Sequence, residues 1–272
     1  EKSMHRKSTG FALVWALSAL VLSCSTLFAI DHCGNEDFQG TYGILGSGSV
    51  TVPGYPITGP FGRAGRVEAD GKGNVAFSTT ASYNGFIFDE PIAGTYQVFP
   101  DCRIEFKLPP FAPVGLPATF EGVVADNKRE VQFMIVEPLG QTIHATIRRQ
   151  GQQHCSAQNL SGGYALDLSG TFDLVAGQTA LPLQFVRTGQ WVADGRGLFT
   201  ARTFVNYNGF QIMPEDIAGT YAVETNCVVT LQYQDASGQA HQWKGALTDN
   251  GKGAYLIVNE PGSAIIGTLK QQ

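Results

Sequence analysis

The sequence predicts an all-β protein built from two tandem eight-stranded antiparallel up-and-down β-barrels that follow an N-terminal signal helix. The first observation is a duplication, because residues 69–102 and 193–227 share A-D-G-x-G, Y-N-G-F, I-A-G-T-Y-x-V and a closing Cys. The second is composition, since 33 Gly, 17 Phe and only 15% charged residues are typical of β structure. The third is a period-two pattern of apolar residues that restarts in each half.

The duplication divides the chain into three parts. Residues 1–30 form the expected signal peptide, residues 31–150 the first barrel repeat and residues 151–272 the second. Each repeat is long enough to enclose a hydrophobic core of its own, so we expect the two halves to fold separately.

Each repeat is expected to contain eight strands, because turn signals such as Asp70-Gly71 interrupt the apolar alternation. Loops are expected where the numbering offset between the repeats changes, since loops tolerate insertions better than strand ladders do. These places lie near 45–60, 87–91, 108–117 and 139–142. Eight antiparallel strands can close into a barrel, and an open sandwich is the alternative. The strands of the first repeat are expected at 38–46, 61–70, 73–86, 92–99, 102–108, 118–126, 129–137 and 143–149.

The first thirty residues have the features of a targeting segment. Lys2, Arg6 and Lys7 form a basic region, residues 11–22 an apolar region, and residues 27–29 a cleavage site. An uncleaved anchor and a lipoprotein attached through Cys24 are the alternatives. All three outcomes place the rest of the chain outside the cytoplasm, so the protein is expected to be secreted, periplasmic or at the cell surface.

The cysteines outside the leader predict two disulfides. Four cysteines allow three connectivities, but only Cys33–Cys102 with Cys155–Cys227 respects the repeat. A histidine precedes the first cysteine of each pair, yet no second histidine recurs between the halves. With the thiols oxidised, the sequence therefore predicts neither a metal site nor a cofactor.

Polar residues that fall on the inward face in both repeats are the candidate site. Arg63 and Arg187 share a face with Phe and Gly, while Glu137 and Glu260 follow the inward residues of the seventh strand. We expect each arginine to reach the glutamate of its own barrel. One interpretation is a structural ion pair; the other is a pocket in which arginine meets an anionic ligand group and tyrosines orient it. The candidate ligand-binding residues are Tyr42, Arg63, Tyr83, Tyr96, Glu137, Tyr164, Arg187, Tyr207, Tyr221 and Glu260.

Sequence motifs for catalysis, phosphate binding and dinucleotide binding are missing from the chain. The chain has a net charge of −5. The leader carries a net charge of +2 from Lys2, Arg6, Lys7 and Glu1, so the rest of the chain has a net charge of −7. An acidic body argues against binding nucleic acid. We expect no membrane span in the mature form, and the sequence does not indicate an oligomeric state.

The run F-x-G-x-Y, A-D-G-x-G and G-T-Y-x-V followed by Cys, with D-N-G-K and E-P-G near the end, resembles a group of secreted bacterial β-barrel repeat proteins. No activity established for that group can be transferred. The eight-strand layout more distantly resembles calycins and allene oxide cyclase-like barrels, and this resemblance implies a closed barrel.

Three classes of function are compatible with these features. The first is a non-catalytic binding module for a small apolar or amphipathic ligand, including an anionic one, because an eight-stranded barrel can hold one small molecule. The second is a structural or adhesive surface protein with filled barrels. The third is an isomerase or cyclase, which ranks last because no nucleophile and base stand together in the sequence. The interior volume of the barrels distinguishes binding from structure.

Overall fold

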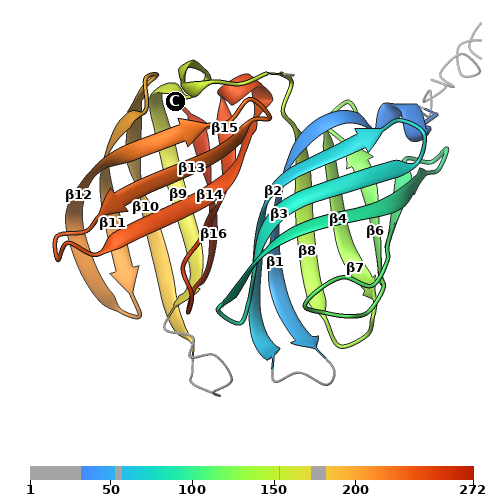
Figure 1. Ribbon diagram of the computed structural model, residues 1–272, viewed down its shortest axis with the longest axis horizontal. Coiled ribbons are helices and arrows are strands. Elements are labelled where there is room, and N and C mark those ends of the chain that lie inside the picture. The colour runs from blue at the N-terminus through green and yellow to red at the C-terminus, as the bar shows by residue number, and fades with distance from the viewer. Residues whose placement is uncertain (1–31, 53–56, 153, 173–181) are drawn as a thin grey trace, which may run out of the picture. The chain divides into compact units, whose positions relative to one another are not determined.

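A computed structural model describes residues 32–52, 57–152, 154–172 and 182–272 (Figure 1). The predicted leader, residues 1–30, and Cys24 within it lie outside the described residues. Within the described ranges no α-helix occurs, and none of the helical turns there has the length and apolar character needed to cross a membrane.

The fold is all-β, with two closed eight-stranded antiparallel barrels in tandem, and it confirms the predicted fold class. The first barrel runs from blue to green in Figure 1 and closes through the pairing of its first and last strands. A 3₁₀ turn at Asn35–Asp37 precedes it. Its strands are β1 (Gln39–Val52), β2 (Ile57–Asp70), β3 (Asn74–Tyr83), β4 (Phe86–Val98), β5 (Arg103–Leu108), β6 (Ala118–Ala125), β7 (Glu130–Glu137) and β8 (Thr142–Arg149).

The second barrel runs from yellow to red in Figure 1 and closes in the same way, through β9 and β16. A 3₁₀ turn at Ala157–Asn159 precedes it, and another at Asp249–Gly251 joins two of its strands. Its strands are β9 (Ser161–Phe172), β10 (Leu183–Asp194), β11 (Leu198–Tyr207), β12 (Phe210–Val223), β13 (Val228–Gln234), β14 (Ala240–Thr248), β15 (Gly253–Val258) and β16 (Ala264–Gln271).

Alternation of inward and outward residues builds each core, as the period-two pattern predicts. In β10 the inward residues Phe185, Arg187 and Trp191 are buried, while the outward residues that alternate with the inward ones are exposed. Gly189 is inward as well, and a Cβ there would come within 2.2 Å of the carbonyl oxygen of Arg202 on β11. Glycine at this position therefore lets the two strands approach each other closely.

The predicted loop at 87–91 is wrong, because these residues belong to β4. The chain turns earlier, at Asn84-Gly85, where both residues have positive φ angles of 50° and 83°. Asn-Gly is the dipeptide that a two-residue hairpin turn favours, and the sequence contains it. The second repeat has one residue more than the first in this region. That residue forms a β-bulge in β12, opposite Thr203 and Val205 of β11.

The loop expected at 45–60 is also much shorter than predicted. Strands β1 and β2 pair continuously up to Val52 and Ile57. Long paired strands satisfy backbone hydrogen-bonding groups that a loop would leave to water. By contrast, the loops expected near 108–117 and 139–142 lie between strands, as predicted.

Two disulfides join Cys33 to Cys102 and Cys155 to Cys227, which confirms the predicted pairing. Each links the segment before the first strand of a barrel to the turn before its fifth strand. Disulfides of this structural kind indicate an oxidising environment.

The two barrels belong to one compact unit, residues 33–272. Outward side chains that a lone barrel would expose to water are buried, among them Ala64 of β2 and Ile257 of β15. Lys244 of β14 pairs with Asp89 of β4 at 2.9 Å. The barrels therefore have separate cores but share a contact through their outer faces, and separate folding of the halves stays a prediction.

Replacing both Cys155 and Cys227 by alanine should lower the free energy of unfolding by about 4 kcal/mol. The bond spans 72 residues of sequence, and its loss restores that loop's conformational freedom to the unfolded chain. Guanidinium denaturation followed by circular dichroism measures the change. The matched control is the Cys33→Ala and Cys102→Ala double variant, which should show a similar loss; a decrease below about 1 kcal/mol in both variants would contradict a structural role for these bonds.

Candidate functional site

A buried ion pair occupies one end of the first barrel. Arg63 of β2 is only 6% exposed, and its guanidinium donates hydrogen bonds to the carboxylate of Glu90 and, at 3.0 Å, to the hydroxyl of Tyr83. The Tyr83 hydroxyl donates in turn to Oε1 of Glu90 at 2.7 Å. Arginine, tyrosine and glutamate thus form a closed triangle in which the charges are compensated.

The predicted partner of Arg63 is wrong, because Glu137 is exposed on the outer face of the barrel and accepts a hydrogen bond from Thr119 at 3.2 Å. A bulge causes the error. Glu137 pairs with Thr119 while Ile135 pairs with Phe120, so β7 carries one extra residue there and the alternation of faces reverses.

Glu90 and its counterpart Glu215 could have been found from the sequence. Glu90 lies two residues before the inward Ile92, so parity along the strand puts it inside. The offset of 125 that relates Ile92 to Ile217 also relates Glu90 to Glu215. The recurrence of an inward carboxylate was therefore visible beside the arginines.

The first barrel is filled at this end by its own loop. The connection between β5 and β6, residues 109–117, sends Phe111 and Val114 toward the ion pair, and the Arg63 guanidinium lies 5.9 Å from the ring centre of Phe111. The hollow that remains measures about 20 Å³, room for about one water molecule and too little for a ligand.

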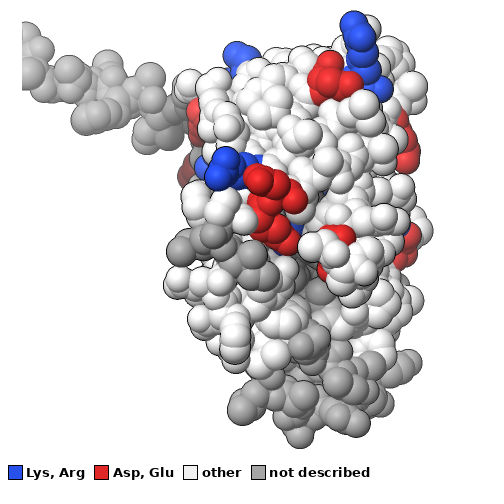
Figure 2. Space-filling model, turned by 90° about the vertical axis from the view of Figure 1, so that its left-hand side faces the viewer, with Lys and Arg blue, Asp and Glu red and all other residues white. Residues whose placement is uncertain are grey.

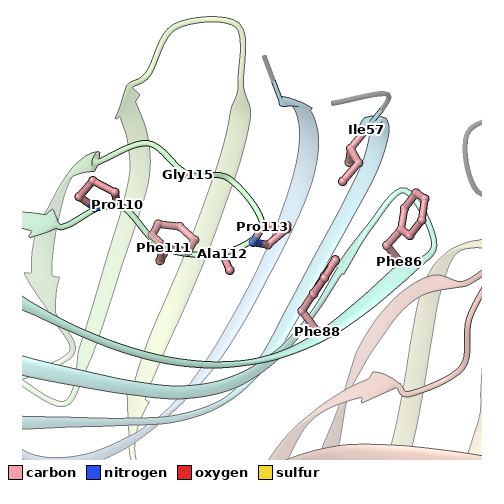
Figure 3. Close-up of a pocket in the computed structure, with 8 residues that line it drawn as sticks. All are labelled: Ile57, Phe86, Phe88, Pro110, Phe111, Ala112, Pro113 and Gly115. Carbon is pink, nitrogen blue, oxygen red and sulfur yellow. The ribbon is translucent and has the colours of Figure 1, made fainter. Parts of the chain in front are cut away.

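The outer side of the same loop forms an apolar groove of about 620 Å³ (Figure 3). In Figure 3 the loop from Pro110 to Gly115 lies across the groove from Phe86 and Phe88, with Ile57 at the start of β2 nearby. All the side chains that line it are apolar. Such a groove can bury an apolar surface, but its lining offers no side-chain hydrogen bond to orient a ligand.

The second barrel repeats the buried arginine with a different set of partners. Arg187 of β10 is 2% exposed and donates to the hydroxyl of Tyr233 at 2.7 Å, to the hydroxyl of Tyr207 at 3.3 Å and to Glu215 at 2.7 Å. Glu260, its predicted partner, binds His241 instead. Tyr233 has no equivalent in the first barrel, because Leu108 stands at the matching position.

The equivalent triangle of hydrogen bonds in the second barrel lacks one of its three sides. No hydrogen bond joins Tyr207 to Glu215 in the described structure, whereas the equivalent Tyr83 and Glu90 are bonded. Tyr207 and Glu215 are separated by one residue more along the hairpin, and the bulge in β12 holds that residue. Glu215 accepts through Oε2 from Arg187, so among the described residues Oε1 has no donor.

The protonation of these groups follows from their burial and charges. Burial opposes the charge of Arg187, but the neighbouring Tyr233 and Glu215 outweigh that effect and raise its pKa. Burial raises the pKa of Tyr233 to about 12 and also raises the pKa of Tyr207. Both phenols therefore keep their protons at neutral pH and can act as hydrogen-bond donors.

A cavity of about 550 Å³ opens beside this network in the second barrel. The connection between β13 and β14 is short, residues 235–239, and it lacks the plug that residues 109–117 supply in the first barrel. The guanidinium of Arg187 lies 5.6 Å from the ring centre of Phe185 and 5.9 Å from that of Trp243. The apolar wall of the cavity consists of Leu168, Phe172, Phe185, Trp243, Val258 and Ile265.

Charged side chains at the mouth of the cavity are bound to one another. His241 faces Glu260 through Nδ1 at 3.0 Å and Asp235 through Nε2 at 3.3 Å, and its ring stacks on that of Tyr233. Hydrogen bonds, of which Ser237 gives the strongest, lower the pKa of Asp235. Both imidazole nitrogens thus already face carboxylates of the protein. Among the described residues no group of His, Cys, Asp and Glu is suited to hold a metal ion.

The other candidate tyrosines lie away from this network. Tyr96 and Tyr221 donate to the backbone carbonyls of Phe38 and Leu160, each at 2.7 Å. Tyr42 and Tyr164 donate in the same way to backbone oxygens of Gln39 and Gly251. The hydroxyls of Tyr96 and Tyr221 thus tie the segments before the first strands to the barrels. None of the four tyrosines lines the cavity.

The distribution of charge on the surface bears on whether the protein binds nucleic acid. The face drawn in Figure 2 is largely uncharged, and several of its positive groups lie beside negative ones. Nucleic-acid binding needs clustered Lys and Arg. On the described part of this face no such cluster is visible.

The fold and the site together define two related barrels, one filled by its own loop and one hollow. A scan of the chain against protein-family models found no match, and a search of curated proteins found no similar sequence.

The variant Arg63→Met should destabilise the protein by about 3 to 5 kcal/mol, because it leaves Glu90 buried without its positive partner. The double variant with Glu90→Leu should recover much of that loss. Urea denaturation of the single and double variants measures both steps.

The matched control for this pair is Arg63→Met combined with Glu137→Leu. Glu137 is exposed and bonded to Thr119, so this second change should recover nothing. Recovery by Glu137→Leu, but not by Glu90→Leu, would contradict the assigned ion pair.

Proposed function

We propose that the protein is a non-catalytic binding protein whose second barrel holds one small amphipathic molecule. The observation that carries the proposal is the contrast in interior volume, about 550 Å³ in the second barrel against about 20 Å³ in the first. A hollow of that size with an apolar wall and a few inward polar groups has the character of a small-molecule site.

The lining supports an amphipathic rather than a purely apolar ligand. Phe185, Trp243 and Ile265 offer an apolar surface, while the hydroxyls of Tyr207 and Tyr233 offer hydrogen bonds inside the barrel. Burial of an apolar ligand surface would supply the binding free energy, and the hydroxyls would orient the ligand.

The filled interior of the first barrel supports a second candidate function, a structural role for residues 31–150. Its loop residues Phe111 and Val114 occupy the place that a ligand would take, and the triangle around Arg63 is closed. In this proposal the first barrel is a scaffold and the second carries the site.

We further propose that the protein works outside the cytoplasm. The basic and apolar segments at the start of the sequence support export, and the two disulfides suit an oxidising compartment.

Binding in the second barrel can be tested with the neutral probe N-phenyl-1-naphthylamine, whose fluorescence rises in apolar surroundings. The variant Val258→Trp places a larger side chain in the cavity, so it should weaken binding of the probe by at least about tenfold. Fluorescence titration of the mature chain measures the Kd.

The matched control is Val192→Trp, the same substitution at an exposed residue of β10. It should leave the Kd unchanged. If the two variants bind the probe as the parent protein does, the probe sits elsewhere, for example in the groove of the first barrel, and the proposal fails.

A further inference from the structure

We infer that the ligand of the second barrel carries an uncharged group that both donates and accepts a hydrogen bond, a hydroxyl, and that this group sits between Tyr207 and Glu215. The inference rests on the proposed function and specifies the chemical class of the ligand as an apolar alcohol. The comparison of the two barrels is its starting point, because the first barrel shows what the closed network looks like.

In the first barrel a direct hydrogen bond joins the equivalent tyrosine and glutamate, so no ligand group fits between them. The Tyr83 hydroxyl accepts from Arg63 and donates to Oε1 of Glu90 at 2.7 Å. The Tyr83 hydroxyl thereby both accepts and donates a hydrogen bond, and the loop residues Phe111 and Val114 lie beside the triangle.

In the second barrel the equivalent tyrosine and glutamate are not bonded to each other. The Tyr207 oxygen accepts from Arg187, but its hydrogen has no acceptor among the described residues. Oε1 of Glu215 has no donor among them either. Tyr233 adds a second hydroxyl whose oxygen accepts from Arg187 and whose hydrogen is likewise unassigned within the described part of the chain. All three residues line the cavity.

A hydroxyl matches this arrangement chemically. Its hydrogen can be donated to Oε1 of Glu215, and its oxygen can accept from Tyr207 or Tyr233. These oxygens are open to solvent in the free cavity, and a ligand that enters displaces the solvent from them. A ligand that pairs them therefore binds more tightly than one that leaves them unpaired. The ligand thus replaces the bond that Tyr83 and Glu90 make in the first barrel.

A charged group fits less well between Tyr207 and Glu215, because the charge of Glu215 is already matched there by that of Arg187. A carboxylate would lie against Glu215, and Arg187 is committed to Glu215 and to two tyrosines. An ammonium group would lie beside the Arg187 guanidinium and would lose its own hydration. The lining holds one guanidinium against the carboxylates of Glu215, Asp235 and Glu260, so its net charge is negative whether His241 is neutral or protonated, which disfavours an anion further.

The experiment compares four probes of one shape, 4-phenylbutan-1-ol, butylbenzene, 4-phenylbutyrate and 4-phenylbutylamine, by isothermal titration calorimetry on the mature chain at pH 7. The alcohol should bind about tenfold more tightly than butylbenzene, and both charged probes should bind more weakly than the alcohol. If the carboxylate or the amine binds most tightly, or if the alcohol and butylbenzene bind equally, the inference is overturned while the proposed function stands. If none of the four binds, the proposed function itself fails.

The variants Tyr207→Phe and Tyr233→Phe locate the hydroxyl. Their combination should remove most of the preference for the alcohol over butylbenzene while leaving the affinity for butylbenzene within about twofold. The matched control is Tyr255→Phe in β15, outside the lining of the cavity, which should leave the preference unchanged. A preference that survives the loss of both cavity hydroxyls would overturn the assignment, and circular dichroism confirms that each variant is folded.

Discussion

A guanidinium buried in each barrel is the constraint on which the rest of the interior depends. Removing an arginine from water is unfavourable unless a carboxylate and further acceptors surround it. Glu90 with Tyr83 meets that need in the first barrel, and Glu215 with Tyr207 and Tyr233 meets it in the second. Because the strands close on themselves, these groups share one enclosed space with whatever else fills the barrel.

Two small sequence differences then separate the halves. The loop of residues 109–117 is long enough to fold back over Arg63, whereas its counterpart at 235–239 is not. One extra residue in β12 forms a bulge between Tyr207 and Glu215, so their direct bond is absent where the first barrel has one. A duplication thus supplies two similar scaffolds, and short insertions decide which of them is hollow.

The repeat made much of this fold predictable. The strand number, the barrel closure, the disulfide pairing and the inward position of Arg63 and Arg187 all follow from patterns that occur twice. Strand parity failed at Glu137 because a bulge reverses the faces, and local alternation does not reveal a bulge. The cavity was not predictable, because its volume depends on where loop side chains fall in three dimensions. Tyr233 and Trp243 line it together with Arg187, although both are distant from Arg187 in the sequence.

The central claim is that an alcohol-bearing molecule enters the second barrel and not the first. A crystal structure of the mature chain soaked with a bromine-labelled phenylbutanol tests it most directly, because anomalous scattering locates the bromine independently of the protein. The account predicts one bromine peak inside the second barrel, near Phe185 and Trp243, with the hydroxyl between Tyr207 and Glu215. A peak only in the groove between Phe86 and Phe111, or none in either barrel, would contradict it.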